Sequence, residues 1–169
     1  MKQLSSTGFA LFGAGHVAIS YGLARFAFGL FVPPIRAELA LQPVQIGVIG
    51  ALPLISFVLA TLFAPFAADR LGARMAAILS GACGVGGLAL IAGAADALML
   101  AAGVFACGIG TGLMMPALTA AMQAVVERSL HGRVSAVMNA GTSIGVIVAV
   151  PAVLLLGGDW RLAYAAFAA

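Results

Sequence analysis

Residues 97–124 read ALMLAAGVFACGIGTGLMMPALTAAMQA, a run that contains no charged side chain. About 20 apolar residues in an α-helix are enough to cross the hydrocarbon core of a bilayer. The sequence therefore predicts a membrane-spanning helix here, and similar apolar runs lie before and after it. The predicted spans cover residues 8–32, 45–67, 75–94, 97–124 and 134–156, and a sixth apolar run begins at Trp160.

The composition of the whole chain also favours a helical membrane protein and excludes a soluble domain. Of the 169 residues, 63% are hydrophobic and 8% are charged, whereas a soluble domain has about 25% charged residues. So few charged groups cannot cover a surface that faces water, and the lipid bilayer is the expected surrounding. The 22 glycines allow helices to approach closely in lipid. The net charge of +3 is spread along the chain and predicts no nucleic-acid partner.

Basic residues between the spans predict the orientation of the chain. Cytoplasmic loops of membrane proteins are enriched in Lys and Arg. With the N-terminus inside, five basic residues face the cytoplasm, namely Lys2, Arg70, Arg74, Arg128 and Arg133, and two face the other side, namely Arg36 and Arg161. We therefore expect a multi-pass protein of the inner (plasma) membrane with a cytoplasmic N-terminus. Its first apolar run is longer than a signal-peptide core and is expected to be retained.

Two connections carry residues that predict where helices end or reverse. Gly72, between the second and third spans, permits a tight reversal. Asp69 in the same loop is expected to accept hydrogen bonds from the start of the next helix. Arg70 and Arg74 are expected to hold the loop at the anionic cytoplasmic face. The Pro33-Pro34 pair is predicted to end the first helix, because proline lacks an N–H donor.

In this loop the sequence resembles the major facilitator superfamily (MFS), which has a signature of the form G-x-x-x-D-R-x-G-R-R/K there. Four positions match, namely Asp69, Arg70, Gly72 and Arg74, whereas Pro65 replaces the leading glycine and Ala73 replaces the first paired basic residue. The segment Trp160-Arg161, with Tyr164 and Phe167, is similar to the opening of the family's sixth helix. The stretch from Tyr21 to Leu30 resembles the YbfB/YjiJ-type branch.

The resemblance implies both a fold and an activity for residues 1–169. The fold is an all-α transmembrane, MFS-like N-terminal six-helix half, built as 3+3 inverted repeats, with five complete spans and the start of a sixth. The activity is secondary active transport of a small solute by alternating access, with the Asp69–Arg74 loop as a gate. A missing C-terminal half or a second copy would be the partner. Val104 stands where many members of the family have an arginine in the fourth span, and Val146 replaces a proline of the drug/proton antiporter branch. Both departures argue against that branch.

Arg25 is the most informative single residue, because a charge inside a span costs at least about 2.5–3.5 kcal/mol on insertion scales. Either its long side chain reaches the outer interface, or it faces a cavity and binds an anionic group of the small-molecule substrate. Tyr21 lies four residues earlier and would share its face on an α-helix. His16 lies on the opposite side. It is either a hydrogen-bonded packing residue or a proton relay.

Polar residues of the fourth and fifth spans complete the candidate cavity. Because these spans run in opposite directions, we expect four of their side chains to meet near the cytoplasmic half: Thr119, Gln123, Ser135 and Asn139. The Ser and Thr hydroxyls favour hydrogen bonds between helices, whereas the Asn139 amide must find partners and is a better cavity candidate. The candidate cavity residues are Arg25, Tyr21, His16, Asn139, Gln123 and Thr111.

No chemistry beyond transport is predicted. The string Gly141-Thr-Ser143-Ile-Gly145 fits a nucleophile elbow, but no histidine follows it and it lies inside an apolar helix. We expect no enzyme activity, no metal site and no cofactor. No Asp or Glu lies inside a span, so proton coupling would use His16 or residues outside this chain. The alternative function is a non-transporting helical membrane scaffold or a half-size homodimeric membrane protein.

Overall fold

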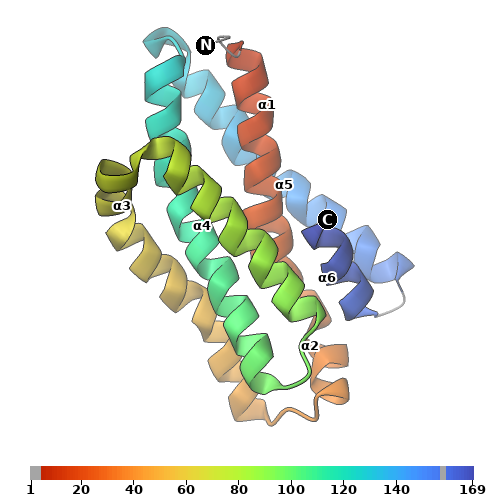
Figure 1. Ribbon diagram of the computed structural model, residues 1–169. Coiled ribbons are helices and arrows are strands. Elements are labelled where there is room, and N and C mark those ends of the chain that lie inside the picture. Colours follow the sequence, from red (N-terminus) through yellow and green to blue (C-terminus); the bar gives the residue numbers. More distant parts are fainter. Residues whose placement is uncertain (1–4, 157–158) are drawn as a thin grey trace.

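Helices make up every regular element of the computed structural model, which describes residues 5–156 and 159–169 and omits the side chains of residues 23–26, 73, 152 and 153. The longer helices lie side by side in an elongated bundle (Figure 1). Five stretches within the described residues are long and apolar enough to cross a membrane: Ser6–Glu38, Pro43–Gly72, Arg74–Ala92, Ala97–Val125 and Arg128–Pro151. The predicted all-α transmembrane fold is therefore confirmed.

The elements follow one another with short connections. The first rod is built from α1 (Ser6–Val17), the π-helical segment η1 (Ala18–Phe26) and α2 (Ala27–Glu38). The rest consists of α3 (Pro43–Ala92), α4 (Ala97–Val125), the 3₁₀ turn η2 (Arg128–Leu130), α5 (His131–Leu155) and α6 (Trp160–Ala168). Ser5, Asp96 and Asp159 begin α1, α4 and α6, and each side chain accepts a hydrogen bond from a backbone N–H of the first turn. Such caps satisfy donors that have no partner within the helix.

The first rod runs through Pro33-Pro34 and ends at Glu38, so the prediction that this proline pair ends the helix is wrong. The fixed φ of proline is compatible with a helix, and its main cost is a lost backbone hydrogen bond. Membrane bundles tolerate that loss because neighbouring groups satisfy the freed carbonyls. Beyond Glu38 the chain turns, and the Arg36 guanidinium donates to the Leu41 carbonyl at 3.3 Å.

Gly72 divides α3 into two antiparallel spans. Its φ of 80° and ψ of 155° are non-helical, and glycine adopts a positive φ without a steric penalty. The reversal therefore lies where the sequence predicted it. Asp69 is exposed, and its predicted hydrogen bonds to the start of the next helix stay a prediction.

Glycines allow α5 to lie directly against the first rod. A Cβ atom added at Gly22 would overlap the backbone of Gly145, and one added at Gly145 would overlap the Ala18 carbonyl. A Cβ at Gly141 would overlap the Ala14 carbonyl in the same way. The two backbones are therefore in van der Waals contact, which is the packing that small residues permit in lipid.

A second set of glycines joins α4 to both spans of α3. Gly108 and Gly112 face the first span, where an added Cβ would collide with backbone atoms of Pro53 and Phe57, respectively. Gly103 packs against the second span at Gly87. The helix α4 is therefore in close contact with both spans of α3 through glycines.

Arg161 joins three segments at the end of the bundle opposite Gly72. Its guanidinium donates to Glu38 Oε1 at 2.8 Å and to the carbonyls of Ala92 and Ala94 at 3.0 and 2.7 Å. It also lies 4.2 Å from the ring centroid of Trp160, whose Nε1 donates to Glu38 Oε2 at 2.7 Å. We call these interactions the Arg161 clamp, because one side chain connects the ends of α2 and α3 to the start of α6.

We expect Arg161→Gln to lower the free energy of unfolding by about 1–2 kcal/mol, because it removes several hydrogen bonds to a charged group. The expected loss of stability is modest because the Arg161 side chain is about one-third exposed and exposed ion pairs contribute little. Arg161→Lys should lose most of the same stability, because an ammonium group cannot reproduce the planar fork of donors. Thermal unfolding in detergent measures the change. Arg36→Gln, which loses one bond, is the matched control, and a fully stable Arg161→Lys variant would contradict the clamp.

Candidate functional site

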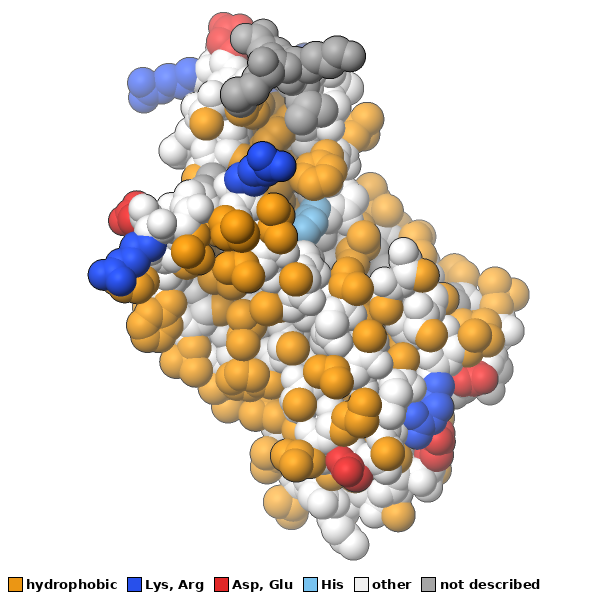
Figure 2. Space-filling model, in the orientation of Figure 1, with side chains coloured by type: hydrophobic (Ala, Val, Ile, Leu, Met, Phe, Trp, Pro, Cys, Tyr) orange, Lys and Arg blue, Asp and Glu red, His pale blue; other side chains and the backbone are white. Residues whose placement is uncertain are grey.

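Charged side chains gather at the two ends of the bundle, with apolar side chains covering the surface between them (Figure 2). Among the described residues, one end carries four arginines and two carboxylates, namely Arg70, Arg74, Arg128, Arg133, Asp69 and Glu127. We call it the basic end. The other end carries two arginines and three carboxylates, namely Arg36, Arg161, Glu38, Asp96 and Asp159. Such a separation fits a molecule whose apolar middle lies in lipid.

A groove of about 460 Å³ lies between α3 and α4, at the half of the bundle nearest the basic end. Thr61 and Asp69 line it from α3, and Thr119 and Gln123 line it from α4. These positions recur in steps of four or eight, so each pair lies on one face of its helix. We call this site the α3–α4 groove.

The first rod reaches the inner part of this groove through Tyr21. The Tyr21 ring packs edge-on against Phe57, with ring centroids 6.2 Å apart and planes at 75°. Phe57 in turn lines the groove together with Met115. The groove therefore leads from an aromatic contact between two spans to the exposed carboxylate of Asp69 at the basic end.

Arg25 lies within the π-helical segment η1, and its side chain is outside the described residues. The expectation that Tyr21 and Arg25 share one face assumed an α-helix. In a π-helix the backbone bonds join residues five apart, so the α-helical assumption does not hold for this segment, and the expectation falls outside the described side chains.

Thr111 and His16 lie at contacts between helices and do not line the α3–α4 groove. The Thr111 hydroxyl is buried and lies 2.7 Å from the Cys107 carbonyl and 3.2 Å from the Ser20 carbonyl. His16 Nε2 is 3.4 Å from Ser80 Oγ, on a helix face away from that groove. Both residues therefore have the hydrogen-bonded packing role between helices that the sequence analysis gave as one of their two alternatives.

The expected meeting of Thr119 and Gln123 with Ser135 and Asn139 is wrong. The first two face α3, as the groove shows. Asn139 is exposed and its Nδ2 donates to the Ser135 carbonyl of its own helix at 2.8 Å. The physical reason is that α4 turns a different face toward α5, where Met122 Sδ accepts a hydrogen bond from Ser135 at 3.6 Å.

The predicted gating loop lies at the mouth of the α3–α4 groove, because Asp69 lines the groove. Arg70 is exposed, and its guanidinium carbon lies 4.4 Å from the ring centroid of Phe66. Arg74 is exposed after the Gly72 reversal. Of the predicted cavity and gate residues, the structure thus brings Asp69 and Gln123 to one groove, with Tyr21 in contact at its inner end.

Three contributors were not predicted. Phe57 and Thr61 lie in a largely apolar run in which scattered hydroxyl groups do not indicate a groove. Ser80 is fully buried and donates to the Gly110 carbonyl at 2.8 Å. A hydroxyl inside the predicted span 75–94 was the available signal, because a polar group in lipid must find a partner.

Several membrane-length helices, close glycine contacts between them and a largely apolar groove with four polar side chains are the features of a polytopic membrane protein. Residues 16–169 match the Major Facilitator Superfamily, and the chain belongs to this family of membrane transporters. The predicted MFS-like helical half is confirmed by this match. No curated protein matches the chain.

Proposed function

We propose that this chain forms one half of a secondary active transporter and that the α3–α4 groove is part of the path taken by a small solute. One observation carries the proposal: the groove joins polar groups of Thr119, Gln123 and Asp69 to the Tyr21–Phe57 contact between two spans. In transporters with repeated halves, substrate sites lie near the bilayer midplane at the interface between repeats. The groove would supply one wall of such a site.

We place the basic end in the cytoplasm of a cell whose inner membrane holds the protein. The four arginines of this end support that orientation through the positive-inside rule. Asp69 would then lie at the cytoplasmic mouth of the groove, where its carboxylate is open to a group of the second half. Opening and closing of this contact would give alternating access.

The presence of Arg25 within a span supports the proposal that the solute is anionic, because a guanidinium is a strong hydrogen-bonding partner for a carboxylate or phosphate. The Tyr21–Leu30 stretch supports the YbfB/YjiJ-type branch by resemblance. His16, held near Ser80, is the candidate for proton coupling within this chain, since its ordinary pKa lies near neutrality. Asn139 stays a cavity candidate, because its exposed amide would face the second half or a second copy.

We expect Gln123→Trp to lower uptake of the transported solute by about tenfold or more, which corresponds to only about 1.4 kcal/mol of binding free energy. The indole would fill the α3–α4 groove. The solute is first chosen from anionic and neutral metabolites as one that raises the melting temperature of the protein. The measurement is then the initial rate of uptake of that solute by the intact protein in proteoliposomes.

Ala124→Trp is the matched control, because Ala124 is the next residue on α4, is exposed and does not line the groove. It should retain uptake and membrane insertion. Equal uptake by both variants would remove the groove from the path. A protein that binds none of these solutes and forms a stable homodimer in detergent would favour the membrane scaffold instead.

A further inference from the structure

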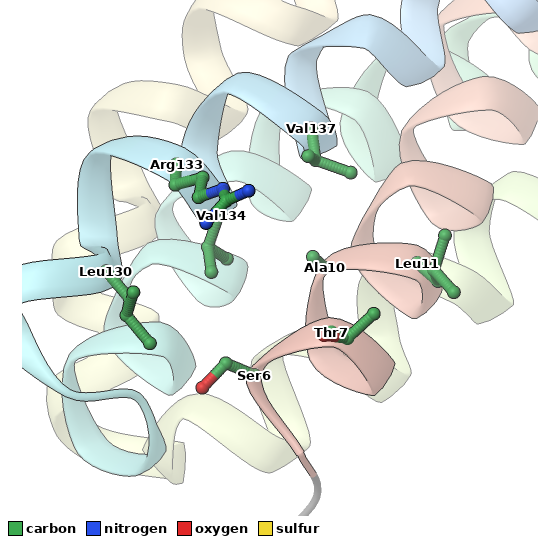
Figure 3. Close-up of a pocket in the computed structure, with 8 residues that line it drawn as sticks. All are labelled: Ser6, Thr7, Ala10, Leu11, Leu130, Arg133, Val134 and Val137. Atoms are coloured by element: carbon green, nitrogen blue, oxygen red, sulfur yellow. The ribbon is translucent and has the colours of Figure 1, made fainter.

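A second cavity lies between α1 and α5 at the basic end, apart from the α3–α4 groove. Its volume is about 380 Å³. Figure 3 shows its lining residues, which come from the first turns of α1, from the turn before α5 and from the first two turns of α5. We call it the α1–α5 cavity.

The lining of this cavity is amphipathic. Arg133, Ser6 and Thr7 supply the polar groups, and the rest of the lining is apolar, including Leu130 and Val137. The two hydroxyls come from α1 and the guanidinium comes from α5, so the polar groups lie on both sides of the cavity (Figure 3). A ligand that satisfies this lining carries an oxygen-rich polar group and an apolar chain.

Arg133 lacks a compensating acid. The one ion pair among the described residues joins Arg161 to Glu38 at the other end of the bundle. Arg133 is exposed and makes no hydrogen bond with the described residues. A guanidinium presents a planar fork of donors that matches the oxygens of a phosphate. The charge of the cavity is therefore complementary to an anionic group.

We propose that the α1–α5 cavity binds the headgroup of an anionic phospholipid, with the phosphate on Arg133 and one acyl chain along the apolar lining. The position favours a lipid over a soluble anion, because the cavity lies between two membrane spans at their charged end. Basic pockets between spans at a cytoplasmic face are suited to such headgroups. The Ser6 and Thr7 hydroxyls can donate to the remaining phosphate oxygens.

The lipid would also connect two helices that otherwise meet through glycine. Below the cavity, α1 and α5 are in backbone contact at Ala14 and Gly141. At the cavity itself the helices are separated, because side chains line the space between them. A bound headgroup would therefore stabilise the spacing of the two helix ends.

The test compares retention of phosphatidylglycerol and phosphatidylcholine by the intact protein, using native mass spectrometry after transfer from mixed vesicles into mild detergent. We expect one phosphatidylglycerol molecule to be retained preferentially. Arg133→Gln should weaken that binding by about fivefold or more, as expected for the loss of one basic group near the membrane surface.

Arg128→Gln is the matched control, because Arg128 is exposed at the same end and does not line the cavity. It should retain the lipid, and an equal loss in both variants would show general surface attraction and overturn the proposal.

Val137→Trp, which fills the apolar part of the cavity, should displace the lipid without a change of charge. The same change at exposed Val148 on α5 should not. Equal retention of the two phospholipids would also overturn the proposal, as would retention of inorganic phosphate in place of phosphatidylglycerol.

Discussion

Gly145→Leu is expected to lower the free energy of unfolding by about 3 kcal/mol or more. Overpacking of a well-packed core costs about 1–3 kcal/mol when side chains can move. Here the new side chain would meet backbone atoms of Ala18 and Gly22, which can yield only if two helices separate. The measurement is the apparent melting temperature of the purified protein in detergent, together with the fraction that inserts into the membrane.

Gly15→Leu is the control for this change. A Cβ atom added at Gly15 would meet nothing within 4 Å, although the residue belongs to the same helix pair. Leucine has a higher helix propensity than glycine, so this variant should be as stable as the unchanged protein or slightly more stable. Comparable destabilisation at both positions would mean that backbone contact between the first rod and α5 does not limit the packing.

Arg25→Ala is expected to lower transport of an anionic solute by about 10-fold to 100-fold while leaving membrane insertion unchanged. A hydrogen bond to a charged group contributes about 1.5–3 kcal/mol, and each 1.4 kcal/mol corresponds to a tenfold change. Initial uptake in proteoliposomes that contain equal amounts of protein gives the comparison. Arg25→Lys should restore part of the activity, because it keeps the charge.

Arg36→Ala distinguishes this role from a general effect of charge. Arg36 is exposed beyond the proline pair, and among the described residues it donates only to the Leu41 carbonyl. Its loss should leave uptake unchanged. Normal uptake by the Arg25→Ala variant would place the Arg25 side chain at the membrane interface and remove it from the substrate site.

The helical membrane fold could be predicted from sequence because the bilayer imposes a simple constraint on each segment. A long run without charges has to be a helix in lipid, and Gly72 was identifiable because a one-residue reversal needs a positive φ. The continuation of the first helix through Pro33-Pro34 was not predictable from local preference. Proline weakens a helix in water, but a bundle offers the freed carbonyls other partners.

The candidate site was less predictable, because it depends on which helix faces turn toward each other. Gln123 and Asp69 lie far apart in sequence and line the same groove. Asn139, in contrast, bonds to its own helix. An amide or hydroxyl in a span must find a partner, but the sequence does not specify whether the partner is a neighbouring helix, its own backbone or a solute. The predicted meeting of α4 and α5 polar groups failed for this reason.

The π-helical segment Ala18–Phe26 sets the direction of the side chains on either side of it. Such segments carry more residues per turn than an α-helix. The faces of α2 are therefore turned about the helix axis relative to those of α1, by an amount that an uninterrupted α-helix would not give. A helical wheel drawn at 3.6 residues per turn across residues 6–38 would assign the wrong faces to one end of this span.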